Sequence, residues 1–317
     1  MVTPPRRPSL VLGTAQWGMP YGIANRSGRP SEEEIRQILH LAADRGVASL
    51  DTARAYGDSE EIIGRIAGRA WEVTTKVPAM GGACSSEAAE RTTKASLAAS
   101  RRALRRDVLD VVLLHDAADR LASNGAAWAR MCDEQRGGGI KTIGVSTSSV
   151  AEAEAAIEEE AVGAVQVAAS VVDRRLVDNG FFERAADRDV RVFARSVFLQ
   201  GALLVPASDL PSHLAPLSPA VQALAAVARD AGVPVGHLCL AYVRDRLRVE
   251  AVVGTESLEQ VRANLTWWAA EIPPDVLDAA VAAAENLPEG VLDPWRWPSS
   301  PPARGTVSGP NDERTSR

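Results

Sequence analysis

The sequence has 317 residues, enough for one large domain or two ordinary ones, and its 46% hydrophobic and 24% charged residues are typical of a globular protein with a sizeable core. Its formal net charge of −6 argues against a nucleic acid or an anionic membrane as partner, and no apolar run approaches the ~20 residues of a membrane span. Three cysteines far apart, in no metal-type spacing, and the lack of a secretory signal predict a cytoplasmic protein with reduced thiols.

Short apolar runs rich in Val, Ile and Leu alternate along the chain with longer amphipathic segments. The runs are residues 9–14, 47–51, 71–76, 108–115, 140–146, 163–169, 190–196 and 249–254. The first helical segment has clear boundary signals: Ser31 as N-cap, Glu34 at the capping-box position and Gly46 as the stop. The pattern is least regular over 196–248, where we expect a loop and two helical segments.

Strands that alternate with helices pair in parallel, which leaves a closed barrel or an open doubly wound sheet. Eight such units over about 250 residues are the usual size of a (β/α)8 TIM barrel. An open dinucleotide-binding sheet would need a G-x-G-x-x-G fingerprint after its first strand, and GTAQWG does not fit it. We therefore expect a single α/β domain, a (β/α)8 barrel over residues 1–298. The Pro-, Gly- and Ser-rich segment 299–317 is expected to be a disordered tail.

Ionisable side chains end three consecutive predicted strands. Asp51 ends the second strand, Lys76 the third and His115 the fourth, and Tyr56 follows in the loop after Asp51. The carboxyl ends of barrel strands form one rim, so we expect these four side chains together there. Each has a structural alternative, Asp51 as a loop cap, Lys76 as a solvated strand end and His115 as a satisfied histidine. A chance gathering of all four is the weaker explanation.

These four side chains could together deliver a proton to a carbonyl oxygen. A phenol with a pKa of about 10 is a poor acid at neutral pH, and a nearby ammonium lowers that pKa because it favours the anion. A carboxylate beside Lys76 would keep the ammonium charged and in place. Tyr56 could then act as the general acid, with His115 as an orienting hydrogen-bond donor.

The sequence resembles the aldo-keto reductases from Leu10 to about Trp297. The matching segments are, in order, LGTAQWG, LDTARAYGDSEEIIG, TTK, DVVLLHD, KTIGVS, SVFLQGALL and VVGTESLEQVRANL. The resemblance implies a metal-free (β/α)8 barrel that binds NAD(P)H across its carboxyl-end rim and reduces an aldehyde or ketone to an alcohol. It also implies the catalytic tetrad Asp51, Tyr56, Lys76 and His115.

The resemblance further implies where a dinucleotide binds. Ser146 and Gln166 match residues that contact the nicotinamide carboxamide. Arg195 stands where the family usually has a Tyr under the nicotinamide; its planar guanidinium could stack there, but it adds positive charge beside the cofactor. The residues expected at the pyrophosphate and the adenosine end are Ser196, Leu199, Gln200, Gly254, Thr255, Glu256, Gln260 and Asn264.

The choice between NADH and NADPH depends on the start of the last barrel helix. NADPH-preferring members place Arg or Lys there, because a phosphate dianion favours charge-assisted donors, whereas this sequence has Gly254, Glu256 and Gln260. A carboxylate would repel the 2′-phosphate but could accept a hydrogen bond from the ribose of NADH. The pattern favours NADH, although Glu256 could simply suit a first helical turn and Arg262 lies nearby.

The substrate is expected to be a small-molecule carbonyl compound whose identity the sequence leaves open, as it does the oligomeric state. Trp17, in the loop after the first strand, is expected to form a wall of the substrate pocket. Trp295 and Trp297 are expected to cover the same mouth. Two other functions stay open. One is an NAD(H)-binding regulatory protein with little or no turnover; the other is a lyase or hydrolase, which would need a metal or carboxylate pair that we do not find.

Overall fold

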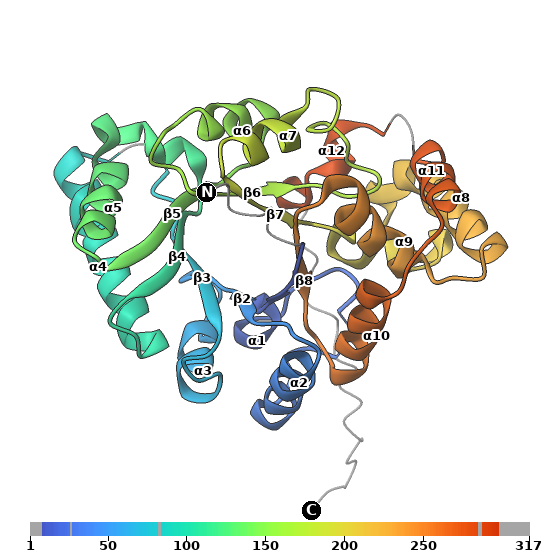
Figure 1. Cartoon of the computed structure of the whole chain (residues 1–317), viewed down its shortest axis with the longest axis horizontal. Helices are drawn as coiled ribbons and strands as arrows, with labels where there is room; N and C mark the ends of the chain where they lie inside the picture. Colours follow the sequence, from blue (N-terminus) through green and yellow to red (C-terminus); the bar gives the residue numbers. More distant parts are fainter. Residues whose placement is uncertain (1–7, 26, 82–83, 285–286, 298–317) are drawn as a thin grey trace, which may run out of the picture.

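The computed structural model describes residues 8–25, 27–81, 84–284 and 287–297 of the chain. Eight parallel strands close into a barrel in chain order, with the helices arranged around it (Figure 1). The strands are β1 (Leu10–Gly13), β2 (Ser49–Asp51), β3 (Glu72–Val77), β4 (Leu109–Leu114), β5 (Ile140–Ser146), β6 (Ala164–Ala168), β7 (Arg191–Arg195) and β8 (Glu250–Gly254). Each predicted run overlaps one strand, and the predicted (β/α)8 barrel is confirmed. The predicted disordered tail, 299–317, lies outside the described residues.

The helices follow the strands in the order expected of βα units. They are α1 (Ala15–Gly18), α2 (Glu32–Asp44), α3 (Ser59–Ile66), α4 (Ser86–Leu104), α5 (Ala126–Arg136), α6 (Val150–Ile157), α7 (Phe181–Asp187), α8 (Ser218–Asp230), α9 (Val235–Ala241), α10 (Leu258–Ala269), α11 (Pro274–Ala282) and α12 (Glu289–Leu292). Short helical turns are η1 (Ala117–Arg120), η2 (Ala122–Gly125), η3 (Leu199–Leu204), η4 (Ala207–Asp209), η5 (Ser212–Leu217), η6 (Tyr242–Leu247) and η7 (Pro294–Arg296). The irregular stretch before β8 thus holds α8 and α9, the two helical segments predicted there.

The boundaries of α2 show how one sequence signal was only half right. The Ser31 hydroxyl accepts from the Glu34 backbone N–H at 3.1 Å, and Gly46, with φ of 79°, follows the helix end, as predicted. The carboxylate of Glu34, however, accepts from the backbone N–H of Leu258 at 3.1 Å. Because α2 and α10 pack side by side, this side chain caps the neighbouring helix and places an acidic group at the start of α10.

Apolar side chains fill the inside of the barrel. Val11, Val111, Leu113, Ala164 and Phe193 form a fully buried cluster within it, and a larger core lies between the strands and the helices. The barrel is therefore packed rather than a pore, and polar chemistry is confined to its two ends. Within the described ranges, no single helix is long and apolar enough to cross a membrane, while one pair bent by 95°, Ser212–Asp230 with Val235–Leu247, passes that test together.

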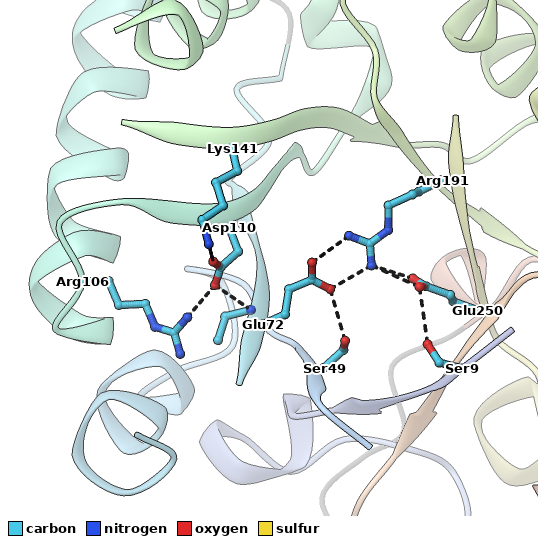
Figure 2. A network of polar contacts seen from close by, with 9 residues as sticks. Ser9, Ser49, Glu72, Arg106, Asp110, Lys141, Arg191 and Glu250 are labelled. Carbon is cyan, nitrogen blue, oxygen red and sulfur yellow. Dashed lines mark hydrogen bonds and ion pairs between the residues drawn. The ribbon is translucent and has the colours of Figure 1, made fainter. Parts of the chain in front are cut away.

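A charged network closes the barrel at the amino ends of its strands (Figure 2). Arg191, at the start of β7, donates to Glu72 at 2.8 and 2.9 Å and to Glu250 at 2.9 and 3.1 Å. The hydroxyls of Ser49 and Ser9 donate to these two carboxylates at 3.2 and 3.4 Å. The guanidinium thus joins strands on opposite sides of the barrel through two carboxylates.

A second cluster extends this network along the outside of β4 (Figure 2). The buried carboxylate of Asp110 accepts from Lys141 at 2.7 Å, from Arg106, and from the backbone N–H of Val73 at 3.1 Å. Arg106, which lies just after α4, is buried by this contact. Together the two clusters leave the amino end of the barrel with paired charges.

Candidate active site

Asp51 and Lys76 form a buried ion pair at the carboxyl ends of β2 and β3. The Lys76 ammonium lies 2.8 Å from both carboxylate oxygens of Asp51 and donates to the backbone carbonyl of Thr52 at 3.0 Å. These acceptors match the three donors of an ammonium group. The side chains of Lys76 and Asp51 are 0% and 5% exposed. Burial lowers the pKa of Lys76, and the Asp51 charge opposes that shift.

Tyr56 and His115 complete the group of four predicted residues on this rim. The Lys76 ammonium lies 5.2 Å from the centre of the Tyr56 ring. The His115 and Tyr56 rings are 5.8 Å apart at 78°, edge to face. Unlike the ion pair, these two rings are partly exposed. The structure therefore places a phenol and an imidazole toward the solvent side, with a fixed charge pair behind them.

The pKa values of the two rings differ from the simplest expectation. Burial raises the pKa of Tyr56 above its ordinary value, and so does the Asp51 charge, while the Arg195 charge opposes them. The expected lowering by Lys76 is thus outweighed in this site. Burial, with Lys76 and Arg195 nearby, lowers the pKa of His115 to about 3. At neutral pH Tyr56 keeps its proton and His115 is neutral, so both can donate a hydrogen bond.

Two glycines hold the backbone of Tyr56 in place, and the sequence analysis did not select them. A Cβ at Gly18 would lie 1.7 Å from the Tyr56 carbonyl oxygen, and one at Gly57 would lie 2.3 Å from the Gly18 carbonyl oxygen. Gly57 also has a φ of 57°, in the left-handed region. After this loop, at the start of α3, the Ser59 hydroxyl donates to the Thr14 hydroxyl at 2.8 Å. Only glycine permits this approach, which fixes the Tyr56 loop against α1.

A buried glutamate supports the same loop from the other side. Glu60 is 1% exposed; its carboxylate accepts from the Thr75 hydroxyl and forms an ion pair with Arg54, which lies between Asp51 and Tyr56 in the chain. Glu60 lies in the first turn of α3. Its charge pairing depends on β3, a contact that spacing along the chain does not reveal.

Ser146, the last residue of β5, pairs in register with Gln166, in the middle of β6; these are the two predicted carboxamide contacts. The side-chain amide of Gln166 donates to Asp51 at 2.7 Å, and the Gln166 carbonyl accepts from the Thr147 N–H at 2.9 Å. Both side chains are buried. The predicted nicotinamide contacts therefore adjoin the Asp51–Lys76 pair, a link the sequence did not show.

Arg195 ends β7 at the same rim. Its guanidinium donates to the Thr147 carbonyl at 2.9 Å and to the Ser196 hydroxyl at 3.3 Å. Its Cζ lies 4.7 Å from the centre of the Trp295 ring. Trp295, on η7, thus covers Arg195 as expected of a residue at the mouth. Trp297 lies beside His213, with ring centres 6.0 Å apart.

The loop after β7, which the sequence predicts to contact the pyrophosphate, has an unusual backbone. Ser196, Leu199 and Gln200 have φ values of 62°, 45° and 54°, unusual for residues other than glycine. The Leu199 and Gly201 N–H groups donate to the Ser196 and Phe198 carbonyls at 2.8 and 2.9 Å, so the segment forms tight turns held by its own backbone. The Leu199 side chain is fully buried. Gln200 donates to the Tyr21 hydroxyl at 3.3 Å and so joins the loop after β1.

The predicted adenosine-end residues surround the start of α10. The Gln260 side chain accepts from the Glu256 N–H at 3.1 Å, and Asn264 is buried one turn further on. Burial raises the pKa of Glu256, and a hydrogen bond with Gln16 opposes it. A Cβ at Gly254 would lie 2.5 Å from the Gln16 amide. This group offers a carboxylate and neutral amides.

Two predicted contacts have side chains that the structure places inside the protein. The Thr255 hydroxyl is fully buried and donates to the Gly13 carbonyl at 2.9 Å, so it joins β8 to β1. Trp17 lies in α1 rather than in a loop, is 0% exposed, and donates from Nε1 to the Thr255 carbonyl at 3.2 Å. A side chain with no exposed surface cannot line a pocket, so the expected wall role of Trp17 is wrong and packing replaces it.

The segments expected to hold a dinucleotide lie next to one another. A Cβ at Gly22 would lie 3.4 Å from the Glu256 carboxylate and 3.8 Å from the Gln200 carbonyl, so the loop after β1, the loop after β7 and the start of α10 meet. With the left-handed loop and the buried amides, this donor set fits a nicotinamide dinucleotide. Among the residues described, no group of three or more His, Cys, Asp or Glu could hold a metal ion.

The sequence matches the Aldo/keto reductase family over residues 9–285. The chain belongs to this family. Aldo-keto reductases are oxidoreductases that use nicotinamide cofactors on small-molecule carbonyl compounds, so the general class of reaction follows. No curated protein matches the sequence.

Solved structures of aldo-keto reductases share the fold. The holo form of aldo-keto reductase AKR11C1 from Bacillus halodurans has a TM-score of 0.68 at 20% identity, over 90% of this chain and 95% of its own. A thermostable aldo-keto reductase, Tm1743, in complex with the inhibitor epalrestat, has a TM-score of 0.67 at 22% identity, over 89% and 97%. A putative aldo-keto reductase from Pseudomonas aeruginosa has a TM-score of 0.61 at 24% identity, over 82% and 89%.

Proposed function

We propose that the protein reduces an aldehyde or ketone to an alcohol with NAD(P)H, and that Tyr56 supplies the proton. The observation that carries this proposal is the grouping on one rim of Tyr56, His115 and the buried Asp51–Lys76 pair. The family supplies the general reaction, and the geometry supports these four side chains as its proton-delivery group. The proposed location is the cytoplasm.

Each side chain has a part that its surroundings support. Tyr56 holds its proton at neutral pH, as a general acid must before the reaction. As negative charge develops on a carbonyl oxygen, Tyr56 passes its proton to that oxygen, and the Lys76 ammonium stabilises the phenolate left behind. Asp51 keeps Lys76 in place, and neutral His115 donates a hydrogen bond that orients the carbonyl. When bound, NAD(P)H supplies the hydride.

We further propose that NADH is preferred over NADPH. Glu256 lies at the start of α10, and Glu34 places a second carboxylate at the same helix start by accepting from Leu258. Two carboxylates there would repel a 2′-phosphate, whereas one of them could accept from the free ribose hydroxyl of NADH. The sequence alone indicated only the first of these carboxylates.

The test is a titration of the intrinsic tryptophan fluorescence with NADH and NADPH, followed by turnover assays with neutral aromatic and aliphatic aldehydes and ketones. We expect tight binding of NADH, weaker binding of NADPH, and oxidation of NADH that depends on the carbonyl compound. Tyr56→Phe should bind NADH equally well without turnover. The variants Glu256→Gln and Glu34→Gln should each narrow the gap between the two cofactors.

Two outcomes would contradict the proposal. If neither dinucleotide binds at millimolar concentration, the reductase function fails altogether. If NADH binds but no carbonyl compound is reduced, an NAD(H)-binding regulatory protein becomes the better description; a pull-down with and without NADH would then show a partner that depends on the cofactor.

A further inference from the structure

Arg195 is a cation without a carboxylate partner at the centre of the candidate site. Among the residues that the structure describes, its guanidinium has hydrogen bonds to a carbonyl and a hydroxyl and a stacking contact with Trp295, but no ion pair. Desolvating a charge without pairing it is costly, so the energy of this group depends strongly on the charge of whatever binds beside it. Arginine stays protonated at any physiological pH, so this charge is permanent.

The nearest acidic groups are already neutralised by other cations. Asp173 and Asp293 both bind Arg175, at 2.8 to 2.9 Å. Asp51 is paired with Lys76. Asp293 also lies 3.6 Å from Arg296. The three carboxylates therefore face three cations other than Arg195, so the charge of Arg195 is left over and makes this rim positive. Its field reaches Tyr56 and His115, since the Arg195 charge lowers the pKa of both rings.

Arg195 also adjoins the predicted contacts of the nicotinamide. Its hydrogen bond to the Thr147 carbonyl ties it to the residue after Ser146, and Arg195 pairs in register with Ala168, two residues after Gln166. The aromatic face of Trp295 covers the guanidinium from the C-terminal side. The charge is therefore held on the strand ends where the redox-active ring is expected, rather than on a free surface side chain.

We propose that Arg195 makes the site distinguish the oxidation states of its cofactor, so that the reduced dinucleotide binds more tightly than the oxidised one. The proposal rests on the function proposed above. The two forms share the same pyrophosphate and adenosine, and differ at the nicotinamide ring, which is cationic when oxidised and neutral when reduced. A fixed cation nearby repels only the oxidised ring, and in a partly buried site this repulsion weakens binding by about tenfold or more.

The experiment measures dissociation constants of the whole protein by tryptophan fluorescence or calorimetry for NADH, for NAD⁺ and for ADP-ribose, which lacks the nicotinamide ring. If NADPH binds more tightly than NADH, the phosphorylated pair is used instead. The variants are Arg195→Gln, which removes the charge, and Arg195→Lys, which keeps it. Arg188→Gln is the matched control. Arg188 lies between α7 and the start of β7, at the other end of this strand from Arg195, and the variant removes one positive charge from an exposed ion pair with Glu158.

We expect the native protein to bind NADH about tenfold or more tightly than NAD⁺. Arg195→Gln should bring the two constants together, mainly by tightening NAD⁺, while Arg195→Lys and Arg188→Gln keep the native ratio. The affinity for ADP-ribose should stay the same throughout.

The proposal can be overturned without the variants. Equal constants for NADH and NAD⁺ in the native protein would contradict it, even if Arg195→Gln failed to fold. If Arg195→Gln weakened all three ligands equally, Arg195 would be a pyrophosphate contact and the proposal would be wrong. Both of these outcomes leave the reductase function intact, whereas binding of neither dinucleotide would overturn both.

Discussion

The two ends of the barrel use the same kinds of charged residue in opposite ways. At the amino end, Arg191 binds two carboxylates, Glu72 on β3 across the barrel and Glu250 on the neighbouring strand β8. At the carboxyl end, Asp51 and Lys76 form a closed pair, but Arg195 has no carboxylate partner among the residues that the structure describes. The charges at the amino end are paired within the protein, whereas the carboxyl end keeps this unpaired cation and proton donors that a ligand could contact. This difference marks which end is functional without reference to any relative.

One strand carries both arginines, which makes the comparison unusually direct. Arg191, Phe193 and Arg195 alternate along β7, so their side chains share the inward side. Phe193 belongs to the packed interior between them, and Arg191 stacks on its ring at 4.8 Å. The same residue type, four positions apart on one strand, therefore has a structural setting at one end and a ligand-facing setting at the other.

The largest effect should come from the proton donor at the carboxyl end. Tyr56→Phe removes the hydroxyl and keeps the ring that packs against His115. We expect kcat for carbonyl reduction to fall by ~10²–10⁴-fold, the usual contribution of general acid catalysis. The dissociation constant of NADH and the thermal unfolding temperature should stay near native values. A variant with near-native kcat would show that another group supplies the proton.

The next largest effect should come from breaking the closed pair at that end. Lys76→Met leaves the Asp51 carboxylate buried beside Gln166 without its ammonium, and should lower the free energy of unfolding by ~3–5 kcal/mol. Chemical denaturation measures this loss. The double variant Asp51→Asn with Lys76→Met removes both charges and should recover part of the stability. If the double variant were less stable than Lys76→Met, the unpaired Asp51 charge would not be the cause of the stability lost in the single variant.

Much of the fold could be predicted because its signals are local. Each strand is a short apolar run between amphipathic segments, and counting such units was enough to choose a barrel. The four polar residues of the site were predictable for the same reason, since Asp51 ends β2, Lys76 is the next-to-last residue of β3 and His115 directly follows β4. Strand order in a parallel barrel then places their side chains on one rim.

What the sequence did not reveal depends on contacts between distant segments. Trp17 looked like a loop residue near the rim, but the turn of α1 carries it into the core, where it binds Thr255 at the far end of the chain. Gly18 and Gly57 allow the backbone of α1 to approach the backbone of the Tyr56 loop, and their spacing in the sequence does not predict this contact. Glu34 fitted a capping box, yet its carboxylate caps α10 instead. The contacts of Trp17 and Glu34 depend on closure of the barrel between β8 and β1, and that of the two glycines on the approach of α1 to the loop after β2.

The two arginines of β7 give a smaller, matched effect on stability. Arg191→Gln removes the cation from two carboxylates and should lower the free energy of unfolding by ~2 kcal/mol, the scale of hydrogen bonds to charged groups, with kcat and KM unchanged. Arg195→Gln removes a cation that has no carboxylate and should cost less stability. Denaturation of both variants, each with one charge removed, checks the difference. Equal losses would contradict the contrast between the two ends.

The last effect is absent at neutral pH and concerns His115, whose pKa of about 3 in the folded protein lies below the ~6.5 of an unfolded histidine. Above pH 6.5 both states are neutral and the group contributes no pH dependence. As the pH falls from about 6.5 toward 3, only the unfolded state takes up the proton, so the native state loses stability over this range. His115→Gln should remove that part of the loss. The measurement is the difference in unfolding free energy between native and variant protein at several pH values, in which the titration of other groups cancels.

The control for this prediction is His40→Gln, which removes a histidine exposed on α2, far from the rim. The change in pH dependence must be greater for His115→Gln than for this control if the lowered pKa comes from the site. The same lowered pKa has a kinetic consequence, because His115 remains neutral throughout the range in which an ordinary histidine titrates. The pH profile of kcat should therefore show no histidine titration near pH 6.5. A titration there that disappears in His115→Gln would contradict this prediction. It would mean that the Lys76 and Arg195 charges do not lower the pKa of the imidazole as their positions require.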